Sequence, residues 1–313
     1  MAKYILRIAT SCLLFAYIAF KVDWGTVASA FKLIRPDFYF LSTLVALICP
    51  VVMASKYHVM TKGTQIELSI LRLTAINYIS RFYAVFLPTA LGPELVRWYK
   101  VTQNKRGRSF FLASTILERI LFLLVLLAFG SIPLLGFTFN QNITLFTHQL
   151  APILTSALFV LIGGLVFFFF PNAQRKLKQL TKKSLNIQED SGVGRFLAEF
   201  ELKHSVLSVV GPLFALTLLW QLFFVVRMLL LFWSLEIGVT LIDVAWMGSL
   251  VMLLQVLPIT FAGLGVREGA YAYLFALYGF EAEKGVVLGM LFFSQMLIFA
   301  SVGAILNVIE RQN

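Results

Sequence analysis

The chain has 313 residues, of which 59% are hydrophobic and only 13% are charged. Soluble domains average about 45–50% apolar and about 25% charged residues, so this composition excludes a soluble enzyme, a disordered chain and a nucleic-acid module. The formal charge of +11 is explained by basic loops that face anionic lipid headgroups on the cytoplasmic side. Length and composition together predict an all-α integral membrane protein.

Six apolar stretches approach the length of about 20 residues that a helix needs to cross a bilayer. They are Tyr4–Phe20, Phe38–Lys56, Phe110–Gly130, Leu150–Phe170, Val206–Glu236 and Gly285–Ile309. The first is similar to a signal peptide but lacks a small-x-small cleavage site, so we interpret it as a retained helix. After it, Val22–Leu33 is expected to form a short interfacial helix.

The distribution of Lys and Arg between the loops predicts the sidedness of the chain. These residues gather in segments 57–72, 97–108 and 171–205, and they are absent from segments 131–149 and 237–242. The positive-inside rule places the first three segments and both termini in the cytoplasm, with the chain in the inner membrane. The loop at 21–37 disagrees with this assignment, because it carries Lys21, Lys32 and Arg35 on the predicted outer side.

Two apolar stretches, residues 70–97 and 243–279, are interrupted by Pro and Gly. One reads Phe86-Leu-Pro-Thr-Ala-Leu-Gly-Pro-Glu94, the other Val256-Leu-Pro-Ile-Thr-Phe-Ala-Gly-Leu-Gly-Val-Arg-Glu268. Each has Leu-Pro, a Leu-Gly among small residues, and then Glu. The alternatives are two re-entrant segments or two kinked full spans, and the loop charges favour re-entrant segments. The expected turn residues are Pro88, Gly92, Pro93, Pro258, Gly263, Gly265 and Gly269.

Position along the chain supports an internal repeat. Two spans precede each interrupted stretch and one span follows it. An odd number of crossings per half turns the second half upside-down, so residues 1–130 and 131–313 are predicted to form an inverted repeat. Interrupted segments at matching positions of inverted repeats are typical of secondary transporters.

Eight charged residues lie within or against apolar sequence, where a charge at a helix centre costs about 2.5–3.5 kcal/mol on insertion scales. They are Arg81, Glu94, Arg97, Glu118, Arg119, Arg227, Arg267 and Glu268. One interpretation is a substrate site in which Arg forks and half-helix N-termini bind a phosphate group. The other is a set of buried ion pairs that stabilise the fold. Adjacent residues on a helix point in different directions, so Glu118 and Arg119, like Arg267 and Glu268, are expected to pair elsewhere.

Sequence motifs for other chemistry are missing. The chain has no Gly-x-x-x-x-Gly-Lys-Ser/Thr loop for ATP, no His-Glu-x-x-His and no Cys/His cluster with metal spacing. We therefore expect no metal site, no cofactor and no catalytic residue set. An ion gradient, the membrane potential or a downstream sink is then the expected source of energy.

Three motifs together resemble a known family. They are Leu91-Gly-Pro-Glu-Leu-Val-Arg97, Ser109 with Ile116-Leu-Glu-Arg119, and Leu257-Pro through Gly263-Leu-Gly-Val-Arg-Glu-Gly269. Over nearly the whole chain the sequence is similar to the membrane region of lysylphosphatidylglycerol synthases and to related flippase-like membrane proteins. The resemblance implies that a lipid with a polar headgroup moves between leaflets. It also implies that Glu94, Arg97, Glu118, Arg119, Arg267 and Glu268 occupy the family's polar positions.

Two departures from that family narrow the expectation. Two-part members carry a soluble aminoacyl transferase domain, and this chain ends at Asn313 without one, so lysyl transfer is not expected. Members often have an Asp shortly after the Glu-Arg pair, whereas residues 120–124 here are Ile-Leu-Phe-Leu-Leu. The second departure disfavours a cationic aminoacyl lipid and leaves a phospholipid or a polyprenyl-phosphate-linked sugar as the substrate.

The combined prediction is a lipid translocase that works without ATP hydrolysis. A phosphate headgroup would lie between the re-entrant tips, bound by Arg81, Arg97, Arg119 and Arg267. The alternatives are an intramembrane transferase acting on a lipid carrier, with Glu94 or Glu268 as the base, and a small-anion secondary transporter. A further alternative is a non-transporting partner of a cytosolic transferase, with segment 171–205 as its contact. The expected partners are the lipid itself, a separate transferase and a second copy in a homodimer.

Overall fold

The structure is a computed structural model that describes residues 24–62, 66–86, 92–102, 108–136, 141–169, 206–256 and 263–312. Within these ranges the regular elements are all α-helices, which confirms the predicted all-α class. The helices are α2 (Trp24–Lys32), α3 (Pro36–Thr61), α4 (Ile70–Phe86), α5 (Gly92–Thr102), α6 (Arg108–Gly136), α7 (Gln141–Phe169), α10 (Val206–Ser234), α11 (Leu241–Val256), α12 (Val266–Leu277) and α13 (Ala282–Gln312).

Four of the described helices are long and apolar enough to cross a bilayer. These candidate spans are Pro36–Thr61 in α3, Ser114–Leu135 in α6, Val210–Ser234 in α10 and Ala282–Glu310 in α13. They match four of the six predicted spans. The stretch predicted at Leu150–Phe170 falls in α7, whose apolar part is His148–Gly164. The predicted helix at Tyr4–Phe20 and the basic segment 171–205 lie outside the described residues.

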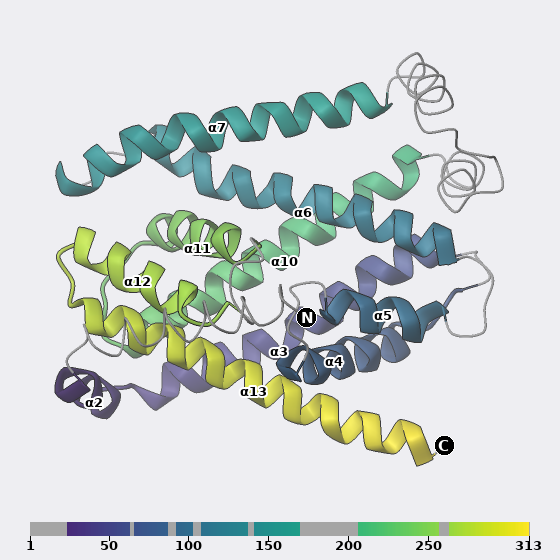
Figure 1. Cartoon of the computed structure of the whole chain (residues 1–313), viewed down its shortest axis with the longest axis horizontal. Coiled ribbons are helices and arrows are strands. Elements are labelled where there is room, and N and C mark those ends of the chain that lie inside the picture. Colours follow the sequence, from purple (N-terminus) through teal and green to yellow (C-terminus); the bar gives the residue numbers. More distant parts are fainter. Residues whose placement is uncertain are drawn as a thin grey trace, which may run out of the picture.

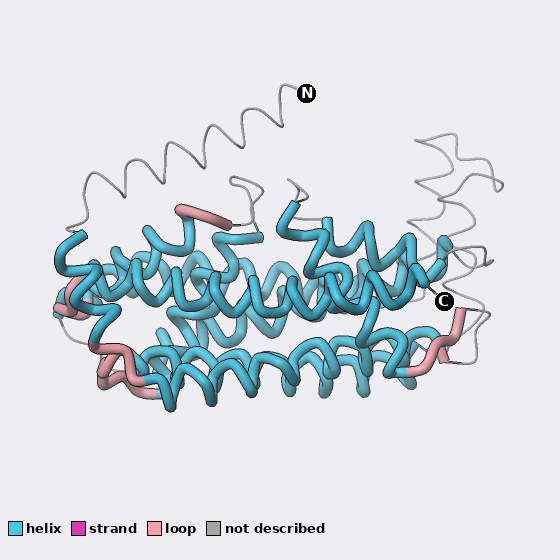
Figure 2. Tube along the Cα trace, turned by 90° about the horizontal axis from the view of Figure 1, so that it is seen from below, coloured by secondary structure: helices cyan, strands magenta, loops and turns pink. Residues whose placement is uncertain are grey.

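Two pairs of shorter helices lie between the long ones. Helices α4 and α5 have 17 and 11 residues, and α11 and α12 have 16 and 12, so none reaches the length needed to span a bilayer. Figure 1 shows α4 and α5 toward the end of the molecule that holds the C-terminus, and α11 and α12 toward the opposite end. Most of the described loops lie at the two ends of the molecule, and one short loop lies between them (Figure 2). The short helices are of the length expected for re-entrant segments, while the side from which each pair enters and the inverted repeat stay predictions.

Helix α4 is anchored to α3 around Pro50. A proline inside a helix removes one backbone hydrogen bond and loosens the turn around it. Here the amide of Asn77 donates to the Pro50 carbonyl at 3.0 Å, and the hydroxyl of Tyr78 donates to the Leu47 carbonyl at 2.9 Å. These bonds fix the depth of α4 along α3, and with it the depth of Arg81 one turn further on.

Helix α13 packs against both short pairs through glycines. A Cβ at Gly303 would collide with the backbone carbonyl of Tyr78 in α4, and a Cβ at Gly285 would lie 2.6 Å from the Tyr271 carbonyl in α12. At Gly289 a Cβ would lie 2.9 Å from Cγ of Glu268. Since glycine leaves backbone and side chains free to approach this closely, α13 holds α4 and α12 at once.

The outer ends of both pairs are tied together by polar side chains. Glu310 at the end of α13 accepts hydrogen bonds from Arg72 in α4 and from Lys100 in α5, the latter at 2.5 Å. At the other end, the Tyr278 hydroxyl donates to Asp243 at 2.6 Å and so joins the end of α12 to the start of α11. Burial and the bond to Asp243 raise the pKa of Tyr278, so this hydroxyl remains a donor at physiological pH.

Candidate functional site

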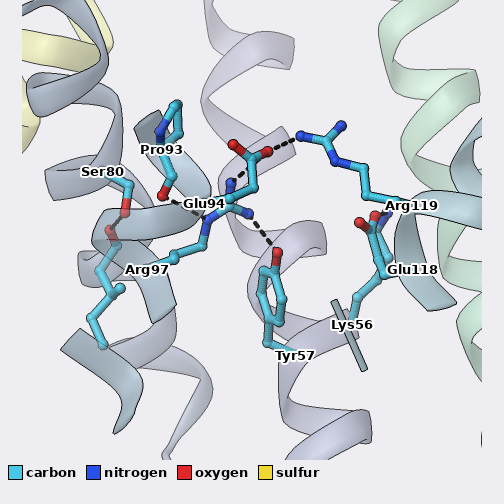
Figure 3. Close-up of polar contacts among 9 residues, drawn as sticks. Lys56, Tyr57, Ser80, Pro93, Glu94, Arg97, Glu118 and Arg119 are labelled. Atoms are coloured by element: carbon cyan, nitrogen blue, oxygen red, sulfur yellow. Dashed lines mark hydrogen bonds and ion pairs between the residues drawn. The ribbon is translucent and has the colours of Figure 1, made fainter. Parts of the chain in front are cut away.

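The start of α5 places Glu94 between two arginines. Gly92 and Pro93 open the helix and Glu94 lies in its first turn, where a negative charge suits the helix dipole. One carboxylate oxygen, Oε1, pairs with Arg97 one turn later at 3.5 Å and with Arg119 from α6. Figure 3 shows Glu94 between these two guanidinium groups. The other oxygen, Oε2, is buried and has no hydrogen-bond partner among the residues that the structure describes.

Arg97 also joins the start of α5 to α3. Its Nη1 donates to the Tyr57 hydroxyl at 2.7 Å, and its guanidinium carbon lies 5.2 Å from the centre of the Tyr57 ring. Arg97 is 7% exposed. The Glu94 carboxylate and the Tyr57 hydroxyl together hold the Arg97 guanidinium in one orientation. The N–H groups of its planar fork therefore point in defined directions.

Lys56 and Glu118 form a second ion pair that sequence reasoning missed. Lys56 lies at the end of a predicted span and was not a candidate, although Glu118 needed a cationic partner. The two side chains are 1% and 2% exposed, and Lys56 Nζ lies 2.6 Å from Glu118 Oε1. Glu118 and Arg119 therefore do bond to different partners, as their adjacent positions on α6 predict.

The start of α12 behaves differently, because Arg267 and Glu268 pair with each other. Arg267 donates to Glu268 Oε1 through Nε at 3.0 Å and through Nη2 at 2.5 Å. Glu268 Oε2 accepts the backbone N–H of Gly265 at 2.7 Å, as an acidic residue at the third helical position does in a capping box. The expectation that adjacent residues pair elsewhere is wrong here, because the carboxylate folds back over the helix N-terminus within reach of Arg267.

Glycines form the turn that precedes α12. Gly263 and Gly265 have φ values of 74° and 82°, which residues with a Cβ rarely adopt. Gly269 continues the first turn, its N–H donating to the Gly265 carbonyl at 2.9 Å. Two other predicted turn residues, Pro88 and Pro258, lie outside the described residues.

Arg227 in α10 has a neutral partner. Its Nε donates to the side-chain oxygen of Gln295 in α13 at 2.8 Å, and its guanidinium carbon lies 4.1 Å from the ring centre of Phe292. Arg227 is only 6% exposed, and within the described ranges its Nη2 has no hydrogen-bond partner. Among the described residues no carboxylate pairs with it.

Arg81 near the end of α4 is exposed, in contrast to the other arginines of α5, α10 and α12. It is close enough to Arg97, Arg119 and Arg227 for electrostatic repulsion with each of them. Within the described part of the chain Arg81 has no ion pair. An exposed cation close to three others adds to a local positive potential, which attracts anions.

A family model gives the chain its place among known proteins. The model of the transmembrane region of lysylphosphatidylglycerol synthases matches residues 4–304. The chain belongs to this family. No curated protein and no solved structure shows a significant match. The match confirms the resemblance found in the sequence and identifies a multi-pass membrane protein tied to phospholipid handling.

In this member of the lysylphosphatidylglycerol synthase membrane family, the charges of the candidate site do not balance among the described residues. The cationic side chains are Lys56, Arg81, Arg97, Arg119, Arg227 and Arg267, and the carboxylates are Glu94, Glu118 and Glu268. Six positive charges against three negative charges leave a net charge of +3, with Arg81 exposed and Arg119 37% exposed. An excess of positive charge inside a membrane protein is costly unless an anion compensates it.

Proposed function

We propose that the protein moves a lipid with a phosphate-containing headgroup between the two leaflets of the inner membrane, without ATP hydrolysis. The family supports a role in phospholipid handling. The observation that carries the proposal is Arg81, an exposed residue that has no acidic partner among the described residues and lies within electrostatic range of three further arginines. A phosphate diester supplies the negative charge that this group lacks.

The two arginines around Glu94 give the site two states. Arg97 and Arg119 share Glu94, so their charges are partly neutralised. A phosphate that reaches Arg81 competes with Glu94 for these two guanidinium groups. Binding is then an exchange of one anion for another, which lowers the cost of taking up a charge and of releasing it again.

The lipid tails need no site of their own. Only the headgroup has to cross the apolar interior, while the acyl or prenyl chains remain in the bilayer. The proposed inverted repeat would present related surfaces to each side in turn, with α4–α5 accessible from the cytoplasm and α11–α12 from outside.

The test is lipid movement by the purified protein in liposomes. Fluorescent phosphatidylglycerol is incorporated in both leaflets, and the fraction protected from an impermeant quencher is followed over time. Wild-type protein should expose the inner-leaflet lipid, and Arg81→Gln should slow this at least tenfold. Arg35→Gln is the matched control, because Arg35 is half exposed at the end of the molecule and pairs with Asp37. Equal rates for wild type and Arg81→Gln would contradict the proposed site.

The same liposomes distinguish the translocase from an intramembrane transferase and from a small-anion transporter. A new lipid mass after incubation with a donor would establish an intramembrane transferase instead. Uptake of phosphate ions without movement of labelled lipid would establish a small-anion transporter. Lipid movement with neither of these results supports the translocase.

A further inference from the structure

Arg227 and Lys56 occupy matching places in the two halves of the chain. Lys56 lies 14 residues before the start of α4 (70 − 56), and Arg227 lies 14 residues before the start of α11 (241 − 227). Each bonds to a side chain of the helix that follows the short pair. Lys56 meets the carboxylate of Glu118, whereas Arg227 meets the neutral amide of Gln295.

The side-chain amide of Gln295 is held in one orientation by its other hydrogen bonds. The Gln295 amide nitrogen donates to Ser42 Oγ at 3.0 Å and to Thr43 Oγ1 at 3.1 Å. These bonds leave only its oxygen to face Arg227, so the orientation of the amide is determined. An amide oxygen stabilises a guanidinium but does not cancel its charge.

The burial of Arg227 makes an uncompensated charge expensive. Moving an ion out of water costs several kcal/mol even after the protein relaxes, unless a counter-charge is present. Buried donors almost always have an acceptor, yet Nη2 of Arg227 has none in the described chain. A structural role would be served as well by a neutral side chain at this position, so the charge itself needs an explanation.

Neighbouring groups limit what can reach Nη2. Phe292 covers the Arg227 guanidinium at 4.1 Å and lies 5.0 Å from that of Arg267. Arg267 is already neutralised by Glu268, so it does not compete for an acceptor. Arg81, in contrast, is close enough for electrostatic interaction with Arg227 and has no acidic partner in the described ranges.

We propose that Arg227, with Gln295 and Phe292, is a second receptor for the phosphate group, separate from the Glu94–Arg97–Arg119 cluster. This inference rests on the proposed function and assigns a particular contact within it. A phosphate oxygen would accept from Nη2 and supply the counter-charge that Gln295 does not. In this arrangement the headgroup would pass from one receptor to the other by way of Arg81, which interacts electrostatically with the arginines of both.

Gln295→Glu tests the receptor with a nearly isosteric change. The new carboxylate would pair with Arg227 inside the protein and exclude a phosphate. The probe is phosphatidylglycerol, measured by native mass spectrometry against diacylglycerol with the same acyl chains. We expect wild type to retain phosphatidylglycerol preferentially and Gln295→Glu to bind it about tenfold less tightly, which corresponds to about 1.4 kcal/mol.

Asn307→Asp is the matched control for this variant. Asn307 lies on the same helix, is also buried at 7% exposure and donates to the Tyr83 hydroxyl at 3.3 Å. The change from amide to acid is therefore identical in kind but remote from Arg227, and binding should stay within twofold of wild type. Unchanged binding in Gln295→Glu, or an equal loss in Asn307→Asp, would overturn the proposal.

A second variant keeps the test decisive if Gln295→Glu does not fold. Arg227→Gln removes the charge, and a neutral side chain should fold at least as well here. It should lose the same preference for phosphatidylglycerol, and full retention would overturn the proposal. Competition with inorganic phosphate identifies the source of the ligand: displacement of the lipid by phosphate shows that the anion alone suffices, and no displacement shows that the lipid is required.

The binding and transport experiments distinguish a failure of the receptor proposal from a failure of the translocase proposal. If wild type does not move lipid in liposomes but shows the Gln295-dependent preference, the translocase proposal fails and the receptor stands. If lipid moves but Gln295→Glu and Arg227→Gln bind and transport as wild type does, the receptor fails and the translocase stands.

Discussion

Lys56 and Glu118 form the most enclosed ion pair described in the structure, with side chains 1% and 2% exposed. The pair joins α3 to α6, and Lys56 Nζ also lies 5.9 Å from the Trp220 ring of α10. Each charge is tolerated only because the other is present, so the pair determines the register between these helices more than it adds stability.

The first prediction concerns removal of one member of this pair. Lys56→Met should destabilise the protein by about 3–5 kcal/mol, because it leaves the Glu118 carboxylate buried without a counter-charge. Thermal unfolding in detergent measures the effect. The double variant Lys56→Met/Glu118→Met should recover most of the loss, and a single variant as stable as wild type would show that the pair is not buried.

The second prediction concerns Glu94. Glu94→Gln removes the shared carboxylate from Arg97 and Arg119, so both guanidinium groups become available to a phosphate. Phosphatidylglycerol binding should tighten by about threefold to tenfold, measured by native mass spectrometry. Glu310→Gln is the control, since Glu310 lies at the outer end of α13, where it pairs with Lys100 and not with Arg97 or Arg119. Weaker binding in Glu94→Gln would indicate that Glu94 itself contacts the ligand.

Sequence analysis finds the charged residues of the site but not their partners. Charges such as Arg227 and Glu268 are conspicuous in apolar sequence, because insertion costs make unneeded charges rare. Which charges pair depends on distances between helices, which the sequence does not contain. The pairing of Lys56 with Glu118 is therefore not predictable from the position of Lys56 at the end of a span. The rule for adjacent residues failed at Arg267 because it describes helix interiors and not a first turn.

At the scale of elements, the third prediction concerns the contact between α13 and α4. Gly303→Ala should strongly destabilise the protein or prevent folding, because the new methyl collides with backbone rather than with a movable side chain. Gly163→Ala in α7 is the control, since nothing lies within 4 Å of a Cβ there and alanine favours a helix by about 1 kcal/mol over glycine. Thermal unfolding and size-exclusion profiles report both. A Gly303→Ala protein as stable as the control would show that α13 and α4 are further apart.

Pro and Gly residues predict where the helices are interrupted, but the sequence says less about how α13 packs. The breaks follow from local chemistry, since Pro removes a donor and Gly permits positive φ. The motif Gly285-Val-Val-Leu-Gly289 has the spacing of a close helix contact, and this signal was available in the sequence. What the sequence lacks is the identity of the facing helix, because that depends on the whole arrangement.

At the scale of the whole molecule, the fourth prediction concerns sidedness. With the native Cys12 and Cys49 replaced by serine, Lys62→Cys and Glu281→Cys place single thiols in the loops before α4 and before α13. An impermeant maleimide should label Glu281→Cys from outside intact cells and Lys62→Cys only after the membrane is opened. Labelling of both thiols from the same side would contradict the opposite entry of the two helix pairs and the proposed inverted repeat.

The glycine contacts of α13 have a mechanical consequence. The α13 backbone approaches the backbones of α4 and α12 so closely that no layer of side chains at these points could absorb a displacement of α13. We therefore expect the three helices to move as one body, so that a shift of α13 carries α4 and α12 with it.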